Sequence, residues 1–270
     1  MYGRSMKMKT HKKILGIILA MVMVMAAAFV MTGCGDDVDP MELYNKASEN
    51  MTKADDFSYD GGFEMNIKAE GQEVKMNADM DGDYIKSSSD DPTDLQMSTH
   101  VKMNLLNQNQ EMFMYVKDGY TYTNDGTTKS KAPLDKSSAE QIKQLMDTDF
   151  DFDKYVKDSS MEGDVVKMTV DGKKLMSDLM KKVEEATGGD TGNAMVDSYA
   201  QIFEKAGLDE ITIEAGIEDE NFTSFKMDMP MKIDMGNGSK SDADFVINFS
   251  EIKVNSGLKE VEIPDVNQYK

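Results

Sequence analysis

The sequence predicts an α+β fold built on a strongly curved antiparallel sheet of about nine strands. Three observations support that class. Apolar and polar residues alternate with a period of two over most of the chain beyond residue 62, which is typical of strands with one buried face. The dipeptide Asp118-Gly119 is typical of a two-residue hairpin turn. Helical periodicity is confined to the start and the middle, so we expect helices to pack on the concave side of the sheet.

The first predicted element is a helix from Pro40 to about Lys53. Asp39 is a favoured N-cap residue, and proline is common at the first helical position. Apolar residues then recur at helical spacing, at Leu43, Ala47, Met51 and Ala54.

Five strands are predicted in the first half of the chain. They cover residues 63–69, 74–80, 101–105, 111–116 and 120–122, and the last two flank the Asp118-Gly119 turn. The segment 111–116, "EMFMYV", is apolar on both faces, so we expect another part of the chain to cover its second side.

The middle of the chain changes character. Amphipathic helices are predicted over residues 137–146, 173–186 and 195–206, the last ended by Gly207, with a strand at 165–170. Strands return at 211–217, at 224–235 and at 242–254. Pro230 lies inside the second of these, and because proline cannot donate to a strand ladder, it favours an edge or a bulge there.

That strand, "SFKMDMPMKIDM", places methionine on nearly its whole buried face. Three interpretations stay open: ordinary core, a Cu(I) site of soft thioethers, or the wall of a groove for a flexible apolar ligand. Alternate side chains on a strand lie about 7 Å apart, which disfavours the copper site. The candidate ligand-lining residues are Met65, Met76, Met103, Met227, Met229, Met231 and Met235.

The N-terminus predicts export and lipid anchoring. Five basic residues precede an apolar run, Ile14 to Val30, which is followed by "MTGCGDD". This segment resembles a bacterial lipobox, which implies cleavage between Gly33 and Cys34 and a diacylglyceryl group on the Cys34 thiol. Cys34 is the only cysteine in the chain. A plain signal peptide or an uncleaved anchor helix are the alternatives.

Charge excludes one class of partner. Residues 1–33 hold five basic and no acidic side chains, so the rest of the chain carries 25 basic against 50 acidic residues. Such a surface repels nucleic acid, and no nucleic-acid partner is expected.

Catalytic and metal motifs are weak. His100 is the one histidine after residue 33, and a solvated strand histidine is the favoured interpretation. The acidic runs at 79–90 and 147–153 resemble calcium loops but lack the glycine such loops need, so turn and strand carboxylates are favoured there. We expect no catalytic residue, no metal and no cofactor.

The order of these elements resembles the half-open β-barrel lipoproteins, a group that includes LolA, LolB, LppX and LprG. The hairpin "YVKDGYTYTN" and the closing "EIPDV" are also similar to uncharacterised lipoproteins of Gram-positive, clostridia-like bacteria. The resemblance implies a concave sheet that holds acyl chains beneath lid helices.

The sequence therefore predicts three parts: a signal peptide at 1–33, a lipidated cysteine and short tether at 34–39, and a single half-open β-barrel domain at 40–270. The expected protein is not an enzyme. It is anchored through Cys34 to the outer face of the bacterial cytoplasmic membrane and binds a hydrophobic or amphiphilic ligand, such as a lipid. The alternative is a structural or interaction module of the cell envelope without a ligand.

Overall fold

The structure, a computed structural model, describes residues 39–69, 72–87, 89, 91–105, 108–146, 152–178, 208–234 and 240–270. Its strands are β1 (Asp56–Ala69), β2 (Gln72–Ile85), β3 (Gln96–Leu105), β4 (Gln108–Lys117), β5 (Tyr120–Asn124), β6 (Lys129–Pro133), β7 (Val156–Glu162), β8 (Val165–Asp171), β9 (Glu210–Glu218), β10 (Asn221–Asp234) and β11 (Lys240–Val254). The helices include α2 (Pro40–Lys53) and α3 (Lys136–Met146), residues 172–178 are also helical, and there are short 3-10 turns η1 (Pro92–Asp94), η2 (Asp153–Tyr155) and η3 (Val266–Gln268).

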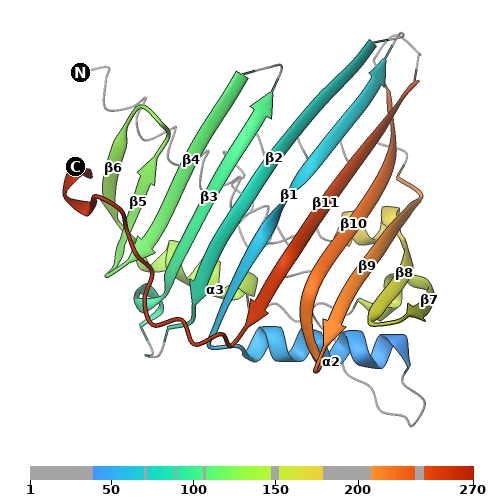
Figure 1. The fold of residues 1–270 in the computed structure, drawn as a ribbon, viewed down its shortest axis with the longest axis horizontal. Helices are drawn as coiled ribbons and strands as arrows, with labels where there is room; N and C mark the ends of the chain where they lie inside the picture. Colours follow the sequence, from blue (N-terminus) through green and yellow to red (C-terminus); the bar gives the residue numbers. More distant parts are fainter. Residues whose placement is uncertain are drawn as a thin grey trace.

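All eleven strands form one antiparallel sheet in the order β6-β5-β4-β3-β2-β1-β11-β10-β9-β8-β7 (Figure 1). The first and the last strand therefore pair at the centre, and β6 and β7 are the two edges. The sheet is curved and does not close, and the predicted α+β class is confirmed. The predicted number of about nine strands was too low, because β6 and β7 were missed.

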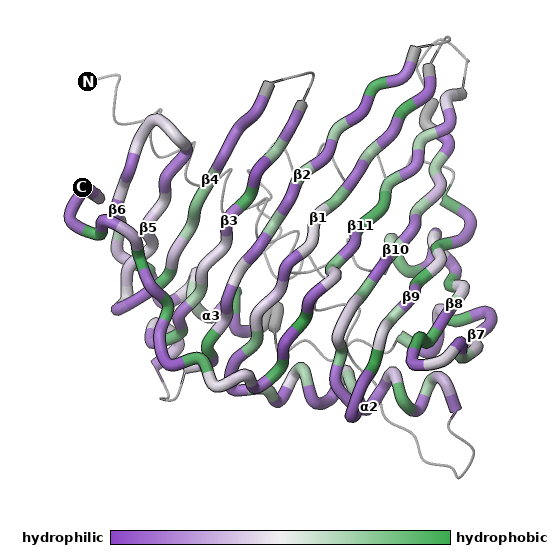
Figure 2. Tube along the Cα trace, viewed as in Figure 1, coloured by the Kyte–Doolittle hydropathy of each residue, from purple (hydrophilic) through white to green (hydrophobic). Residues whose placement is uncertain are grey.

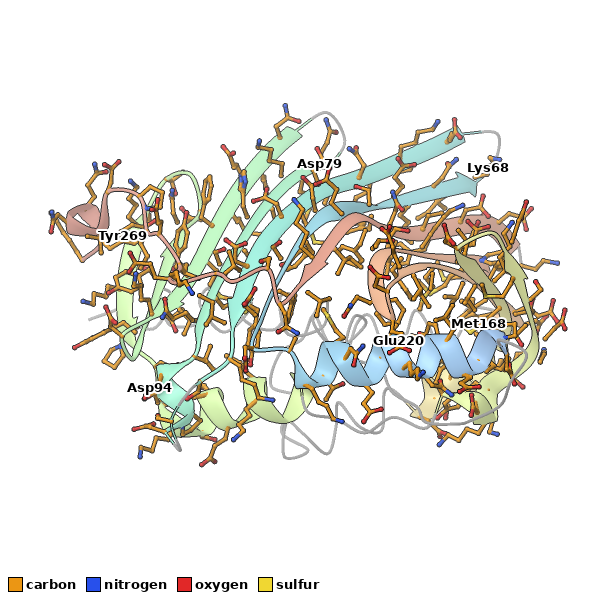
Figure 3. All side chains as sticks on the ribbon, turned by 60° about the horizontal axis from the view of Figure 1, so that its bottom comes forward. Lys68, Asp79, Asp94, Met168, Glu220 and Tyr269 are labelled. Atoms are coloured by element: carbon orange, nitrogen blue, oxygen red, sulfur yellow. The ribbon has the colours of Figure 1, made fainter. Side chains whose placement is uncertain are left out.

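Helix α2 begins as the sequence predicts. The side chain of Asp39 accepts a hydrogen bond from the backbone N–H of Met41 at 2.9 Å, and Pro40 occupies the first turn. The helix lies across one end of the sheet and packs on β7 to β10 (Figure 1). An ion pair between Lys46 and Glu220, 2.7 Å apart, fastens its exposed side to the β9–β10 turn, where Figure 3 shows Glu220 beside the helix.

The predicted hairpin turn is also present. Asp118 and Gly119 both have positive φ, 52° and 72°, which is the backbone that a type I′ turn requires. The predicted helix at 137–146 is α3. Of the helix predicted at 173–186, residues 173–178 are helical and the rest lies outside the described residues, as do the helix predicted at 195–206 and the Gly207 that ends it.

Pro230 lies in an interior strand and pairs with Asp244 in regular register, so it marks neither the sheet edge nor the bulge that the sequence favoured. The strand β9 pairs with β10 only as far as Asp228, opposite Thr212, whereas β11 continues to pair past Pro230. The proline therefore sits where β10 has one hydrogen-bonded neighbour, which explains why the sheet tolerates it.

The C-terminal tail after β11 crosses the sheet on the side opposite to α2 (Figure 1). It covers a small apolar cluster made by Tyr115, Tyr122, Val261 and Tyr269. The ammonium of Lys117 donates to the backbone carbonyl of Val261 at 2.7 Å. The expectation that another part of the chain covers the second side of residues 111–116 is thereby confirmed.

Candidate ligand-binding site

The two faces of the sheet differ in chemistry. We call the face that α2 covers the inner face and the opposite one the outer face. In an antiparallel pair, directly opposite residues share a face. On the inner face Met65 therefore stands between Met76 of β2 and Phe245 of β11, and Phe245 in turn faces Met229 of β10. Figure 2 shows the resulting alternation of hydrophobic and hydrophilic residues along β2, β1 and β11.

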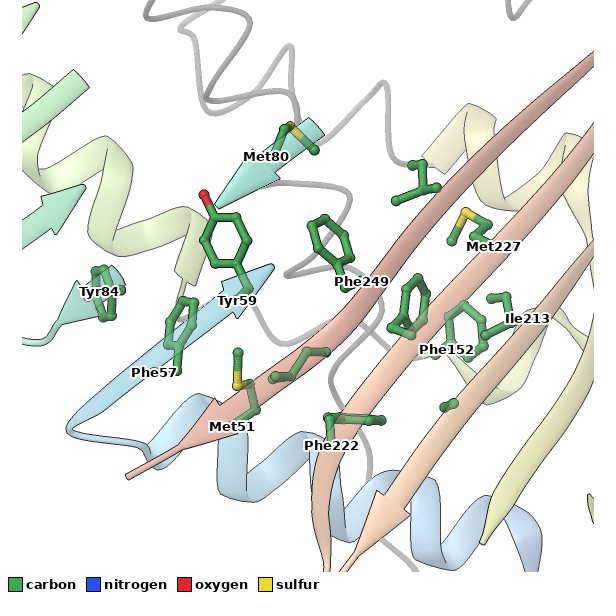
Figure 4. Packing of buried hydrophobic residues seen from close by; sticks show 14 of the residues in the cluster. Met51, Phe57, Tyr59, Met80, Tyr84, Phe152, Ile213, Phe222, Met227 and Phe249 are labelled. Carbon is green, nitrogen blue, oxygen red and sulfur yellow. The ribbon is translucent and has the colours of Figure 1, made fainter. Parts of the chain in front are cut away.

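The inner face is tightly packed at the end next to α2, which we call the closed end. Its aromatic residues, all buried, are Phe57, Tyr59, Tyr84, Phe222, Phe225 and Phe249. Figure 4 shows Met51 of α2 beside this group, with Phe222 directly above the helix.

Tyr59 illustrates how close the packing is at the closed end. Its ring meets Phe249 edge-on, with ring centroids 5.6 Å apart, and its hydroxyl lies 3.2 Å from Oγ1 of Thr99. The ring crosses Gly82, where an added Cβ would lie 2.6 Å from the Tyr59 hydroxyl oxygen, so only glycine fits there. Burial raises the pKa of Tyr59 to about 12.

Helix α2 contributes polar as well as apolar groups to this end. The ring of Tyr44 packs against Phe222 and Phe152, with centroids 5.3 and 5.7 Å apart. Tyr44, Asn45 and Ser48 are all buried, and burial raises the pKa of Tyr44 above its ordinary value. Each of the three has a side-chain oxygen without a hydrogen-bond partner among the described residues.

The opposite end of the inner face is covered less completely. There the apolar side chains are only partly buried, and we name this group the inner patch: Phe63, Met65, Ile67, Met76, Met103 and Phe245. Val74, opposite Ile67 at its margin, is exposed. The two groups share β1, β2 and β11, and on β1 the inner patch begins four residues beyond Tyr59.

The candidate methionines divide between these environments. Met65, Met76 and Met103 belong to the inner patch. Met227, Met229 and Met231 alternate along β10 next to it, but each is at most 5% exposed and packs in the core. Met235 lies outside the described residues. The alternation predicted for β10 is confirmed by the exposure of Pro230 and Lys232 on its other face.

Sequence reasoning missed some members of the site. Phe245 was read as part of a strand and not as a lining residue, although its spacing from Ile247 and Phe249 places it on the same face. Tyr44, Asn45 and Ser48 carried no signal, because polar residues inside an amphipathic helix normally face water.

His100 lies in strand β3, as expected. Its side chain lies on the outer face and contacts other side chains there. Its Nδ1 is 3.0 Å from Asp81 Oδ1, its Nε2 is 2.8 Å from Glu111 Oε1, and its ring stacks on Phe113 with centroids 4.1 Å apart. The interpretation as a solvated histidine therefore needs correction: two carboxylates and an aromatic ring surround it.

The acidic runs can be placed in part. Asp79, Asp81 and Asp83 alternate along the outer face of β2, while Asp90 and residues 147–151 lie outside the described residues. Within the described ranges, no group of three or more His, Cys, Asp or Glu side chains is arranged to hold a metal ion.

The signal segment and Cys34 also lie outside the described residues. Of the helices that the structure does describe, none has the length and apolar character needed to cross a membrane.

Comparison with known proteins assigns a family. Residues 39–268 match a family of unknown function, DUF6612. The chain belongs to that family. No curated protein matches it.

Two solved structures are similar to the chain. LprF from Mycobacterium bovis is 11% identical, with a TM-score of 0.35 over 83% of this chain and 96% of that one. A DUF1329 family protein from Desulfovibrio piger is 10% identical, with a TM-score of 0.29 over 86% and 100% of the two chains. Likenesses this remote carry no information about a ligand.

Proposed function

We propose that this protein is a membrane-anchored surface lipoprotein that binds the apolar part of an amphiphilic molecule, such as a membrane lipid, on the inner face of its sheet. It acts by binding and not by catalysis. The observation that carries the proposal is the inner patch. Among the described residues, six neighbouring apolar side chains of the inner face are left partly exposed there. An exposed apolar patch of this kind marks an interaction site more often than a defect.

The chemistry of the inner patch suits an acyl chain. Half of its members are methionines, whose unbranched and polarizable side chains adapt to ligands of variable shape. The patch adjoins Met227, Met229 and Met231 on β10, so a ligand that spreads sideways from β1 across β11 meets further flexible side chains. None of the described residues supplies a buried charge at that end, which fits hydrocarbon.

The proposed anchor would keep the site near its ligand. Residues 35–39 separate Cys34 from the first residue of α2. At roughly 3.5 Å per residue, five residues span less than about 20 Å, which is shorter than the thickness of a bilayer core. A lipid leaving the membrane would therefore have only a short distance to travel to the domain.

The binding proposal is tested by extracting the protein purified from membranes and identifying bound lipid by mass spectrometry. We expect at least one acyl-chain lipid in stoichiometric amount. Met76→Lys should abolish it, because the half-buried position lets an ammonium reach water while blocking the apolar surface. Lys75→Met is the matched control: it changes the adjacent residue on the outer face and should leave the bound lipid unchanged.

A second candidate function is supported by the burial of the methionines on β10. If they are ordinary core, the protein is a ligand-free module of the cell envelope that presents its acidic outer face to other molecules. Absence of bound lipid in the wild type, together with no change in melting temperature on adding lipid extract, would favour this candidate and contradict the first.

The anchor is tested separately by metabolic labelling with a fatty acid. Wild-type protein should take up the label, and Cys34→Ser should not, because only a thiol receives the diacylglyceryl group. Label retained in the serine variant would contradict lipidation at Cys34 without bearing on the inner patch.

A further inference from the structure

One turn of α2 holds three buried polar side chains that lack partners. Tyr44 is 0% exposed, Asn45 2% and Ser48 0%. The hydroxyl of Tyr44, the amide oxygen of Asn45 and the hydroxyl of Ser48 have no hydrogen-bond partner among the described residues. Positions three and four apart are neighbours on a helix, so Ser48 lies beside both Tyr44 and Asn45. The three side chains therefore lie within one turn on the buried side of α2.

Such an arrangement is costly unless something else supplies the missing bonds. Buried polar groups in folded proteins nearly always have a partner, and each one left alone loses the hydrogen bonds that water would give it. The surrounding residues are apolar: Phe152 and Phe222 pack on the ring of Tyr44. Among the described residues nothing satisfies this cluster of three, and a bound polar group would supply the missing hydrogen bonds.

The side chains define the chemistry of that group. Tyrosine and serine hydroxyls each donate and accept, and the amide oxygen of asparagine accepts, so the matching ligand carries hydroxyl or amide groups. It is uncharged, because a buried anion needs a paired cation. The buried polar residues within the described ranges are Asn45, Ser48, Asp56, Thr99, Thr123 and Ser241, and this set contains no cation.

The position of the cluster relates it to the methionines of β10. Tyr44 contacts Phe222, and Met227 lies five residues further along the same strand. Five residues of strand span about 17 Å. This equals roughly the depth of one leaflet of a bilayer, about 15 Å, and hence the reach of one extended acyl chain. A lipid head at Tyr44 would thus place its chain end at the level of Met227 and Phe63, where the inner patch begins.

We propose that Tyr44, Asn45 and Ser48 form a subsite for the uncharged, hydroxyl-bearing head group of an amphiphile whose acyl chain runs along the inner face beside β10. The proposal rests on the proposed function. Met227, at the far end of this path, is the buried methionine of β10 that the chain meets, and methionine repacks at low cost. The ligand class is a lipid with a neutral head, such as an acylglycerol, and not an anionic phospholipid.

The test measures head-group preference. The full chain, purified in the steroid detergent CHAPS, is loaded with the uncharged fluorescent probe N-phenyl-1-naphthylamine. The probe is then displaced by 1-monopalmitoylglycerol, by methyl palmitate and by palmitate, which share one chain and differ in the head. We expect monopalmitoylglycerol to displace the probe at concentrations at least about tenfold lower than the other two, as expected for one or more added hydrogen bonds.

Single-oxygen deletions assign the preference to the subsite. Tyr44→Phe and Ser48→Ala should each remove most of the preference for monopalmitoylglycerol while leaving the affinity for the naphthylamine probe unchanged. Without ligand, both variants should melt at the same temperature as the wild type or higher, because an unpaired buried oxygen has been removed. Tyr59→Phe is the matched control: its hydroxyl has Thr99 as partner, so it should melt lower and keep the preference.

The outcomes separate the two proposals. If the probe binds but the three palmitoyl compounds compete equally, the subsite is wrong and the proposed function stands. If Tyr44→Phe and Ser48→Ala melt lower and keep the preference, an internal water satisfies these groups and the subsite is again overturned. If the wild type binds neither the probe nor any lipid, the proposed function itself fails and the subsite fails with it.

Discussion

The two ends of the inner face share strands β1, β2 and β11 and similar residue types, yet only at the closed end are the aromatic side chains fully buried. Along β11, Phe249 is buried at the closed end while Phe245, four residues earlier, is partly exposed in the inner patch. Their alternation in the sequence is identical. At the closed end α2 packs over β7 to β10, and its Met51 lies beside the buried aromatic group (Figure 4). Strand periodicity thus predicts which face of a sheet is apolar. Whether that face is buried depends on elements that are distant in sequence.

The two phenylalanines of β11 offer the sharpest test of this contrast. Phe249→Ala should lower the free energy of unfolding by about 3–5 kcal/mol, because a large cavity opens against Tyr59. Phe245→Ala should cost less than half as much, since its side chain is already partly solvated. Urea denaturation of both variants measures the pair. Equal losses would show that the inner patch is as closed as the other end.

Two methionines next to Phe245 offer a second test of the same contrast. Met229 and Met65 flank Phe245 on either side, the first buried and the second partly exposed. Met229→Ala should cost about 2–5 kcal/mol and Met65→Ala about 1 kcal/mol or less. The affinity for lipid should show the opposite order: Met65→Ala should weaken lipid binding more than Met229→Ala does. Comparable affinities for the two variants would argue against the inner patch as the site.

A smaller effect is expected at the start of the helix that seals the closed end. Asp39→Ala removes the acceptor for the backbone N–H of Met41 and should destabilise the protein by about 0.5–2 kcal/mol. Hydrogen exchange should accelerate in the first turn of α2 and leave β1 to β3 unaffected. Asp39→Asn, which keeps an acceptor, should behave as the wild type; a loss equal to that of the alanine variant would exclude capping as the cause.

The smallest expected effect on stability concerns the carboxyl of Asp135. Asp135 accepts hydrogen bonds from the backbone N–H and the hydroxyl of Ser138 at 2.9 and 2.8 Å, and these bonds lower the pKa of its carboxyl. A carboxyl with a lowered pKa stabilises the fold above its unfolded pKa of about 4 and loses that contribution as the pH falls through the folded value.

Asp135→Ala should therefore be less stable than the wild type at pH 7, by less than about 1 kcal/mol because the group is largely solvated. The gap should shrink as the pH drops below about 4. Thermal melts of both proteins across this range measure it. A gap that stays constant with pH would mean that the carboxylate charge plays no part.

Local chemistry made some elements predictable. The N-cap and proline at Asp39-Pro40 fixed the start of α2, and the Asp118-Gly119 dipeptide fixed a turn with two positive φ angles. The edge strands β6 and β7 were missed because "KSKAP" and "VKDSSME" bury little and so show no apolar alternation. Edge strands are recognised by hydrogen bonding to a neighbour, which single-sequence patterns do not record.

The candidate site was predicted less completely than the fold. Methionine content drew attention to β10, and its apolar face was identified correctly, but the pattern could not tell that Met229 is buried while Met65 is partly exposed. The polar cluster on α2 was not foreseen. From the sequence alone, a serine or an asparagine on a helix is expected to face solvent. Only the packing shows whether another element covers it.

The pairing of the first strand with the last limits when the centre of the sheet can form. The backbone N–H of Asp55 donates to Asn255, 200 residues away, at the end of the β1–β11 ladder. The centre of the sheet therefore cannot form while the polypeptide is still being made, because β11 leaves the ribosome last. Contacts this distant in sequence also slow folding. The two halves of the sheet, β1 to β6 and β7 to β11, are therefore joined only once β11 has been synthesised.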